Sequence, residues 1–236
     1  VYKRQFMREV MERMNMRDVT ICYGLTETSP VFTQTSVDDD IPHKCETVGR
    51  AHPPVEVRVL DVNDGHICGP GEHGELCCKG YNVMKGYYKN DKDTHKVLDE
   101  EGWLHTGDMA TMDTDGTLYI RGRSKTMILS GNGQNIYPEE IEDKLNNMYL
   151  VLESLILETE NGKLKALVVP DYEQAELEGV DKNDLPQIMQ NNLTELNTLL
   201  AAYERVSELA IYPTEFEKTP KRSIKRYLYS PSLLTK

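Results

Sequence analysis

Short apolar runs separated by polar turns fill the first half of the chain. Residues 6–16 have helical periodicity, and residues 18–22 then form a short apolar run typical of a buried strand. Residues 55–59 alternate with period two, which predicts a half-buried strand, and residues 75–79 predict a second one. Residues 110–120 hold two short apolar runs around an Asp-Gly pair. This pattern predicts a hairpin, because the pair tolerates the positive φ of a tight turn.

The second half alternates strand and helix patterns. A short strand is predicted at residues 126–129, and Pro138 then begins a helix with two glutamates in its first turn. Residues 151–157 and 164–169 are apolar strands joined across an Asn-Gly turn. A second helix is predicted behind Asp184, its expected N-cap, from an apolar stripe with helical spacing. The stripe consists of Met189, Leu193, Leu196 and Leu200.

These patterns predict an α/β region followed by a separate α+β unit of about 100 residues, a normal domain size. The polar stretch at residues 121–125 is the expected boundary, which gives domains at residues 6–124 and 125–230. Residues 1–5 are set aside because they look like a translated sequencing adapter. The chain begins with Val1 rather than Met, so we expect the native start to be missing.

The charge balance argues against one class of partner. The chain has 27 lysines and arginines against 39 aspartates and glutamates, a net charge of −12, whereas nucleic-acid binding needs a basic surface. No apolar run approaches about 18 residues, so no membrane-spanning helix is expected, and peripheral contact with a membrane is left open. The five cysteines form no C-x-x-C pair, which is typical of a reducing compartment, and we expect a cytoplasmic protein.

Five short motifs carry the candidate chemistry, and each is weak evidence by itself. The first, Y-G-L-T-E at residues 23–27, places an aromatic ring, a hydroxyl and a carboxylate after a predicted strand, although a plain polar loop explains it equally well. The others follow in order: G-E-L at 74–76 with G-Y-Y at 86–88, W-L-H-T-G-D at 103–108, G-R-S-K at 122–125 and G-Q-N-I-Y-P-E-E-I-E at 133–142. Together they resemble the adenylate-forming superfamily of acyl-CoA synthetases, luciferases and nonribosomal-peptide adenylation domains. The resemblance covers residues 20–229.

The resemblance implies a fold and a nucleotide site. The fold would be the C-terminal part of the large adenylate-forming domain, followed by a small mobile α+β domain. Tyr23 would lie against the adenine of ATP or AMP, Thr26 would contact the phosphate, and Glu27 would help to hold Mg²⁺. Asp108 would accept hydrogen bonds from the ribose hydroxyls. The nucleotide-binding residues that the resemblance implies are Tyr23, Gly24, Thr26, Asp108 and Arg123.

The resemblance also assigns functions near the expected boundary. Lys125 falls at the hinge about which the small domain swings, although an exposed linker lysine is the simpler interpretation of the residue alone. The resemblance also implies that Ser130, Gly131 and Gly133 lie in the loop that lines the tunnel for CoA, where glycines would let the backbone approach the ligand closely. His105 is expected to be a packing residue rather than a general base.

The end of the chain departs from the family pattern. Residues 217–226 (E-K-T-P-K-R-S-I-K-R) resemble the terminal motif P-K-T-x-x-G-K-[IVL]-x-R, whose lysine supplies positive charge during adenylation. In an ungapped alignment Ser223 occupies the position of that lysine, and a serine carries no charge. Three explanations stay open: Lys221, Arg222 or Lys225 replaces it, the subfamily uses another group, or adenylation is impaired. Lys221 is the first choice, because its flexible stem can still deliver a point charge.

The implied reaction joins a fatty acid to CoA. ATP and the acid form an acyl-adenylate and pyrophosphate, and the CoA thiol then displaces AMP. Residues 133–138 and the Thr219-Pro220 pair favour a long-chain fatty-acid:CoA ligase. The alternatives are an adenylation enzyme that loads a carrier-protein thiol and a noncatalytic nucleotide-binding protein on the same scaffold. The Ser/Thr/Gly-rich phosphate loop of the family does not occur in these 236 residues. We therefore expect the N-terminal part of the same chain to be missing and the fragment to be inactive by itself.

Overall fold

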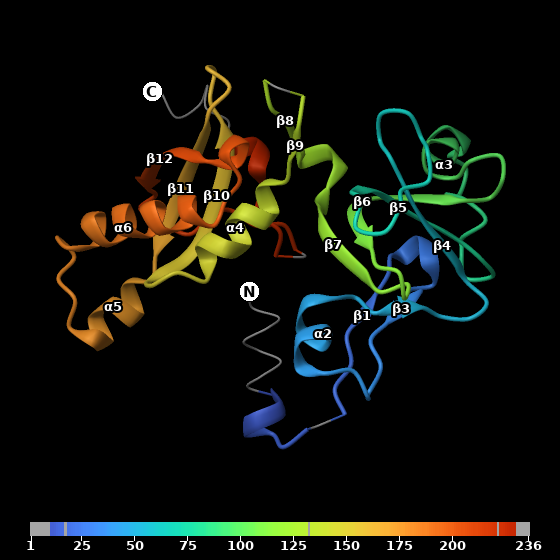
Figure 1. The fold of residues 1–236 in the computed structure, drawn as a ribbon, viewed down its shortest axis with the longest axis horizontal. Coiled ribbons are helices and arrows are strands. Elements are labelled where there is room, and N and C mark those ends of the chain that lie inside the picture. Colours follow the sequence, from blue (N-terminus) through green and yellow to red (C-terminus); the bar gives the residue numbers. More distant parts are fainter. Residues whose placement is uncertain (1–9, 17, 132, 221, 230–236) are drawn as a thin grey trace. The chain divides into compact units, whose positions relative to one another are not determined.

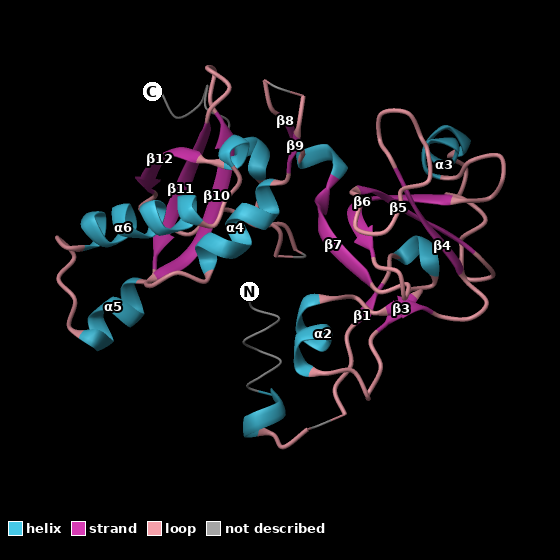
Figure 2. Ribbon diagram, in the orientation of Figure 1, coloured by secondary structure: helices cyan, strands magenta, loops and turns pink. Residues whose placement is uncertain are grey.

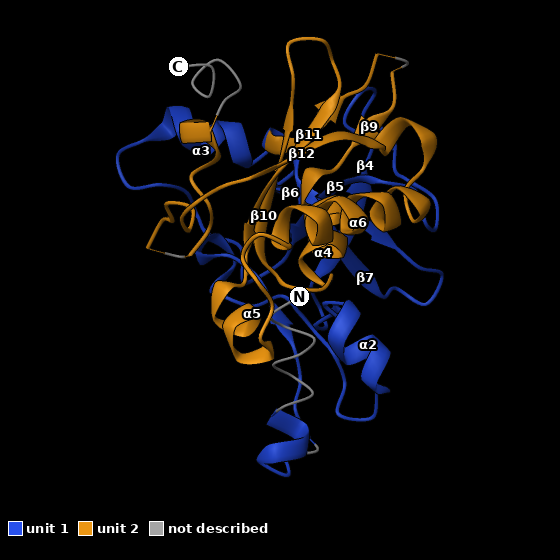
Figure 3. Cartoon of the chain, turned by 90° about the vertical axis from the view of Figure 1, so that its left-hand side faces the viewer, with its two compact units in different colours: residues 1–125 blue, residues 126–236 orange. Residues whose placement is uncertain are grey.

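The structure, a computed structural model, describes residues 10–16, 18–131, 133–220 and 222–229. The chain divides into two compact units, residues 1–125 (unit 1) and residues 126–236 (unit 2), which Figure 3 shows in different colours. Each unit has a hydrophobic core of its own. The mixture of α/β and α+β structure expected from the sequence is confirmed.

Unit 1 is built around an antiparallel four-stranded sheet in the order β4-β5-β6-β7 (Figure 1, Figure 2). Its strands are β4 (Glu56–Leu60), β5 (Gly74–Lys79), β6 (Leu104–Met112) and β7 (Leu118–Arg123). The strands predicted at residues 55–59 and 75–79 and the hairpin at residues 110–120 are therefore confirmed. The sheet packs on a core that includes Phe32 and Leu76, both fully buried.

A second, smaller sheet of unit 1 holds the first motif. Its strands are β1 (Cys22–Tyr23), β2 (Thr33–Gln34) and β3 (Arg50–Ala51), paired antiparallel in that order. The prediction of a strand at residues 18–22 is wrong except for Cys22, because β1 begins only at that residue. The Thr35 N–H does donate to the Ile21 carbonyl at 2.9 Å, but the Ile21 N–H donates to the Thr35 side chain at 2.8 Å. The backbone ladder therefore stops at Cys22.

Short helices complete unit 1: η1 (Thr26–Thr28), α2 (Ile41–Glu46) and α3 (Asp91–Val97). A further short helix, η2 (Ser124–Thr126), spans the boundary between the two units. The side chains of Asp40 and Asn90 cap α2 and α3, because each accepts a backbone N–H from the first turn of its helix. The helix expected at residues 6–16 is described only from residue 10, and it covers residues 10–13.

Unit 2 contains a three-stranded sheet in the order β10-β11-β12. β10 (Val151–Glu158) and β11 (Leu164–Pro170) form the predicted antiparallel hairpin, whereas β12 (Val206–Ile211) runs parallel to β11. The other elements are β8 (Ile128–Leu129), β9 (Asn135–Ile136), α4 (Pro138–Asn146), α5 (Tyr172–Glu178), α6 (Leu185–Thr198), η3 (Ala202–Glu204) and η4 (Arg226–Tyr229). Among the described residues of the whole chain, no helix is both long and apolar enough to cross a membrane.

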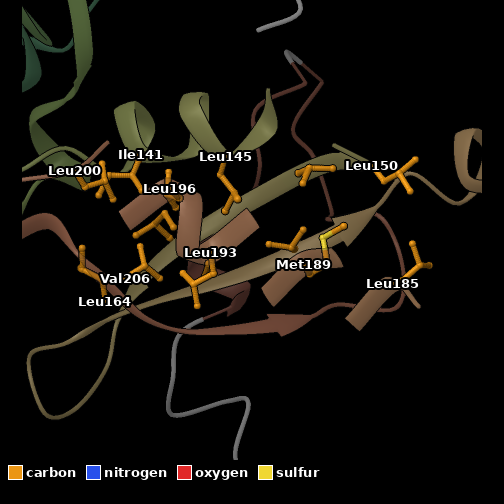
Figure 4. Close-up of a cluster of buried hydrophobic side chains, with 14 of the residues drawn as sticks. Ile141, Leu145, Leu150, Leu164, Leu185, Met189, Leu193, Leu196, Leu200 and Val206 are labelled. Atoms are coloured by element: carbon orange, nitrogen blue, oxygen red, sulfur yellow. The ribbon is translucent and has the colours of Figure 1, made fainter. Parts of the chain in front are cut away.

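The sheet of unit 2 is buried on both faces. Val168 of β11 belongs to the cluster formed with α4 and α6. Figure 4 shows the predicted apolar stripe within this cluster, of which Leu200 lies just beyond the end of α6. The preceding residue, Leu167, points to the opposite face of the sheet. It belongs to a second cluster, with Phe216 and Tyr229 from the C-terminal segment. Burial on both faces explains why residues 166–169 of β11 are continuously apolar rather than alternating.

The two longer helices of unit 2 begin near the predicted positions, with one difference. Pro138 is the first residue of α4, as expected. Asp184 occupies the N-cap position of α6, but its side chain makes no capping hydrogen bond. The backbone of Asp184 is helical (φ −86°, ψ −18°) instead of extended, so its carboxylate does not reach the free N–H groups of the first turn.

An ion pair between the partly buried Arg226 and the buried Glu142 attaches the C-terminal segment to the rest of unit 2. The Arg226 guanidinium pairs with Glu142 of α4 and donates to the Ile156 carbonyl at 3.2 Å. The other Glu142 oxygen accepts the Ile156 N–H at 2.6 Å. Burial raises the pKa of Glu142 to about 7, and the nearby Arg226 charge opposes this rise. The pair therefore connects α4, β10 and the C-terminal segment.

Candidate functional site

Three residues from separate motifs meet in unit 1. The Tyr23 hydroxyl donates to Asp108 Oδ2 at 2.6 Å, and Arg123 Nε lies 3.1 Å from Asp108 Oδ1. Tyr23 ends β1, whereas Asp108 and Arg123 are register partners in β6 and β7. Three motifs that are distant in the chain therefore converge on one carboxylate.

The electrostatics of this cluster favour an acceptor role for Asp108. The residue is 6% exposed and stands between a phenol and a guanidinium. Burial, together with the adjacent Asp108 charge, raises the pKa of Tyr23 well above its usual value, so the phenol stays protonated and donates. The Tyr23 ring is held edge-on by Phe32, with ring centroids 5.3 Å apart. A carboxylate flanked by an aromatic ring and a guanidinium can bind a nucleoside through its ribose and its base.

The first motif forms a closed turn. Thr28 Oγ1 accepts the Leu25 N–H at 2.8 Å and donates to the Leu25 carbonyl at 2.9 Å. A Cβ on Gly24 would lie 2.0 Å from the Pro30 carbonyl oxygen, so the backbone passes too closely for a residue with a side chain. Thr26 is exposed at the start of η1, where its hydroxyl is accessible to a ligand.

Glu27 is held by a second loop of unit 1. The Tyr87 hydroxyl donates to Glu27 Oε1 at 2.8 Å, and the Met84 N–H donates to the Glu27 carbonyl at 2.8 Å. The hydrogen bond to Glu27 raises the pKa of the Tyr87 phenol, which therefore keeps its proton. Sequence reasoning recognised the G-Y-Y motif without assigning a function to Tyr87. The two residues are 60 positions apart, so no local pattern could have joined them.

The donors near Glu27 fit a magnesium ion. Mg²⁺ in proteins commonly takes one or two carboxylates together with substrate phosphates and water, and Glu27 with the neighbouring Thr26 hydroxyl supplies donors of this kind. Three other groups of metal-type side chains occur among the described residues, and none contains Glu27. They are Asp61, Asp64 and His66; His66, Cys68 and Glu72; and Glu75, Cys77 and His105. Burial raises the pKa of Cys77 to about 12, so this thiol stays protonated and is a poor metal ligand.

The residues expected at the hinge and the CoA tunnel lie in two turns. Lys125 is exposed in η2, at the end of unit 1. Ser130 begins the turn between β8 and β9, where its hydroxyl donates to the Gln134 carbonyl at 2.8 Å. Gly131 and Gly133 are exposed, and no atom lies within 4 Å of a Cβ built on either. The glycines therefore stand at an open tip of the hairpin.

The terminal motif forms a tight turn. The Thr219 N–H donates to the Ser223 carbonyl at 2.8 Å, and the Arg222 N–H donates to the Thr219 carbonyl at 2.8 Å. Arg222 has φ +61°, the left-handed conformation that glycine favours, and it stands where the family motif has glycine. This backbone fits the ungapped alignment that puts Ser223 at the lysine position. Ser223 is exposed, and Lys221 lies outside the described residues.

Cations on either side of this turn are already paired. Lys218 Nζ lies 2.8 Å from Glu153 Oε2, and Lys225 Nζ lies 3.1 Å from Glu217 Oε2. Arg222, by contrast, has an exposed side chain at the tip of the turn. The tip is therefore the part of the segment best placed to present a positive charge to a ligand.

Comparison with known families gives the class of protein to which this α/β fold and the Tyr23–Asp108–Arg123 cluster belong. The family model described as AMP-binding enzyme matches residues 2–88, and the model described as AMP-binding enzyme C-terminal domain matches residues 125–230. The chain belongs to the AMP-binding enzymes.

Curated relatives carry the names of acyl-CoA synthetases. The putative acyl-CoA synthetase YngI of Bacillus subtilis is 46% identical over 159 residues, which make up 67% of this chain and 29% of that protein. The mitochondrial medium-chain acyl-CoA ligase ACSF2 of Homo sapiens is 41% identical over 139 residues, or 59% of this chain and 22% of that protein. The chain thus spans less than a third of the length of these relatives.

Solved structures of adenylate-forming enzymes share the fold. ATP-bound MatB from Rhodopseudomonas palustris superposes with a TM-score of 0.74 at 28% identity, covering 91% of this chain and 40% of that chain. The O-succinylbenzoate coenzyme A synthetase MenE from Bacillus subtilis, in complex with AMP, gives a TM-score of 0.74 at 27% identity and covers 94% of this chain and 42% of that chain. This chain therefore corresponds to less than half of each solved protein.

Proposed function

We propose that this chain is part of a fatty-acid:CoA ligase, which activates a carboxylic acid with ATP and transfers the acyl group to CoA. The observation that carries the proposal is the convergence of Tyr23, Asp108 and Arg123 in a chain whose relatives are named acyl-CoA synthetases. Long-chain fatty acids are the first proposal for the substrate, on the basis of residues 133–138 and the Thr219-Pro220 pair. Medium-chain acids are the second, because the ACSF2 relatives are medium-chain acyl-CoA ligases.

In the adenylation step, the residues of unit 1 bind and orient the nucleotide. Asp108 accepts hydrogen bonds from the ribose hydroxyls, Tyr23 packs against the adenine, and Arg123 approaches the same ribose. Thr26 donates its hydroxyl to the phosphate of the adenylate. Glu27 would hold Mg²⁺, which supplies positive charge against the phosphate oxygens when it is bound.

In the thioester-forming step, CoA is the second substrate. We assign Lys125 as the hinge residue, in keeping with its exposed position in η2. We assign the β8–β9 turn, with Ser130, Gly131 and Gly133, to the path of the CoA thiol. The open space around both glycines supports this assignment, since a ligand can approach the backbone there without meeting a side chain.

Replacing Tyr87 with phenylalanine is expected to raise the Mg²⁺ concentration for half-maximal adenylation about fivefold, since it removes one hydrogen bond to a charged group. Without the 2.8 Å bond from Tyr87, the Glu27 carboxylate can rotate away from the metal position. The measurement is fatty-acid-dependent ATP–pyrophosphate exchange by the full-length enzyme at increasing Mg²⁺. Tyr88→Phe is the matched control, because Tyr88 is 88% exposed. An equal response of both variants would contradict the function given to Tyr87.

Replacing Lys221 with alanine is expected to slow adenylation by about 100-fold, the usual cost of losing one group that stabilises transition-state charge. Lys225→Ala is expected to change little, because Lys225 is paired with Glu217. Transfer from a supplied acyl-adenylate to CoA should be unaffected in both variants, which separates loss of the cation from misfolding. A loss of exchange in Arg222→Ala alone would show that Arg222, rather than Lys221, supplies the positive charge of the missing lysine. Unchanged exchange in all three variants would show that none of these residues replaces the missing lysine.

The proposed function is tested by ATP–pyrophosphate exchange of the full-length enzyme with short, medium and long acids. A maximum with long acids supports the first substrate proposal, and a maximum with medium acids supports the second. Because the 236 residues lack the phosphate loop, we expect no exchange from this chain alone, although it should bind AMP. Exchange by the chain alone would contradict this expectation.

The alternatives predict different products. Thioester formation on a phosphopantetheinylated carrier protein, without acyl-CoA, would support the carrier-loading enzyme. AMP binding without any acyl transfer in the full-length protein would support the noncatalytic scaffold. The five free thiols favour a reducing, cytoplasmic location, and flotation with lipid vesicles would test the peripheral membrane contact left open by the sequence.

A further inference from the structure

The strand pair that carries Asp108 is irregular at this residue. The register between β5 and β6 shifts, so that Leu76 alone on β5 lies opposite residues 106–108 on β6. The two additional residues of β6 form a bulge in the strand, called here the Gly107 turn, and Asp108 is its last residue. The position of the Asp108 carboxylate therefore depends on what holds the turn in place.

The carboxylate of Glu75 closes this turn. Its Oε1 accepts the Gly107 N–H at 2.9 Å, and its Oε2 lies 2.9 Å from His105 Nδ1. Gly107 has φ +71°, so its N–H points away from the regular ladder and needs a partner outside it. Both Glu75 oxygens are thus engaged with β6, one on each side of the turn.

His105 is itself held by neighbouring groups. Its Nε2 lies 3.7 Å from Asp99 Oδ2, and Asp99 is fixed by the Arg58 guanidinium at 3.1 Å and the Trp103 N–H at 2.8 Å. The side chains of Glu75 and His105 are only 21% and 30% exposed. Glu75 therefore has a defined orientation, set from one side by His105 and from the other by Gly107.

The contacts of Asp108 leave little room for movement of the turn. Asp108 is 6% exposed and meets Tyr23 at 2.6 Å and Arg123 at 3.1 Å. A displacement of the turn by about 1 Å would lengthen both contacts beyond hydrogen-bond distance. Thr106 adds support, because its hydroxyl accepts the Asp108 N–H at 3.1 Å, but it does not contact the Gly107 N–H that Glu75 binds.

We propose that Glu75 is a positioning residue for the nucleotide: it fixes the Gly107 turn and thereby places the Asp108 carboxylate for the ribose, while His105 fixes Glu75. The proposal rests on the nucleotide-binding function proposed for Asp108. The proposal gives Glu75 of the G-E-L motif and His105 of the W-L-H-T-G-D motif a shared function. From the sequence alone, the first was interpreted as part of a strand and the second as a packing residue.

The test compares AMP binding to this chain in three variants by isothermal titration calorimetry. Glu75→Ala is expected to bind AMP about tenfold more weakly, in line with the loss of one charge-assisted hydrogen bond. Glu75→Gln is expected to restore most of the affinity, because its amide oxygen can still accept the Gly107 N–H at the position of Glu75 Oε1. Glu72→Ala is the matched control, since Glu72 accepts the Gly69 N–H at 2.6 Å in the β4–β5 loop.

A second readout works without nucleotide. In chain labelled with ¹⁵N-glycine, the Gly107 amide should exchange with solvent faster in Glu75→Ala, recover in Glu75→Gln and stay unchanged in Glu72→Ala. Unchanged AMP affinity or unchanged Gly107 exchange in Glu75→Ala would overturn the proposal. If the unsubstituted chain binds no AMP while Gly107 exchange still depends on Glu75, the hold of Glu75 on the Gly107 turn is supported, and the proposed nucleotide-binding function of Asp108 is what fails.

Discussion

At about pH 8, replacing Arg226 with alanine is expected to destabilise unit 2 by about 3 kcal/mol, because the buried Glu142 must then either stay charged without its countercharge or take up a proton. Glu142 keeps only the Ile156 N–H as a hydrogen-bond donor among the contacts described above. The same substitution removes the bond from Arg226 to the Ile156 carbonyl, so the C-terminal segment loses its attachment to β10. Urea denaturation followed by far-UV circular dichroism gives the free energy of unfolding.

The pH dependence of this loss follows from the pKa of Glu142. Burial raises that pKa from 4.5 to about 7, so the stability contributed by Glu142 is complete below about pH 4.5 and is lost as the pH rises to about 7. Arg226 lowers this pKa, and removing it extends the loss to higher pH. The stability difference between the parent chain and Arg226→Ala should therefore grow between about pH 6 and about pH 8.

Two controls distinguish the loss of the Arg226–Glu142 ion pair from general damage to the C-terminal segment. Lys225→Ala removes the adjacent, exposed ion pair with Glu217 and should leave stability nearly unchanged. The double variant Glu142→Gln with Arg226→Met removes both charges and should recover much of the loss. Equal destabilisation by Arg226→Ala and Lys225→Ala would contradict this account.

Replacing Asp108 with asparagine is expected to weaken AMP binding to this chain by about 100-fold, as two hydrogen bonds to a charged acceptor are lost or weakened. The amide group of asparagine has one acceptor oxygen, and its N–H₂ would face either the Tyr23 hydroxyl or the Arg123 guanidinium. Isothermal titration with AMP measures the change directly.

The same hairpin provides the control for Asp108. The Tyr119 hydroxyl donates to Asp113 Oδ2 at 3.0 Å, which is also a tyrosine–aspartate contact, but an exposed one. Asp113→Asn should therefore bind AMP with the affinity of the parent chain. If both asparagine variants bind AMP as tightly as the parent, Asp108 does not contact the nucleotide.

Elements encoded by neighbouring residues were predictable from the sequence. The β10–β11 hairpin follows from two apolar runs around an Asn-Gly turn, and α4 begins at Pro138 because proline is well suited to the first turn. The exceptions have local causes. Residues 18–21 do not extend β1 because the Thr35 hydroxyl accepts the Ile21 N–H, and Asp184 does not cap α6 because its backbone is helical.

Contacts between distant segments were not predictable from periodicity. The family resemblance pointed to Tyr23 and Asp108 separately, but their hydrogen bond joins positions 85 residues apart. Periodicity fixes which residues share a face of one strand or helix, and it carries no information on which strands become neighbours. The hydrogen bond from Tyr87 to Glu27 and the contacts of Glu75 with Gly107 and His105 required the register of the assembled sheet for the same reason.

Trp103 makes the two units optically distinguishable. It is the only tryptophan of the chain, and its ring lies in unit 1 with the Arg58 guanidinium 4.0 Å from the ring centroid. Unfolding of unit 1 exposes the indole and separates it from this cation, so its fluorescence follows unit 1 alone, whereas circular dichroism follows both units. One denaturation series recorded with both signals therefore resolves the unfolding of each unit in the intact chain, without labels or truncation.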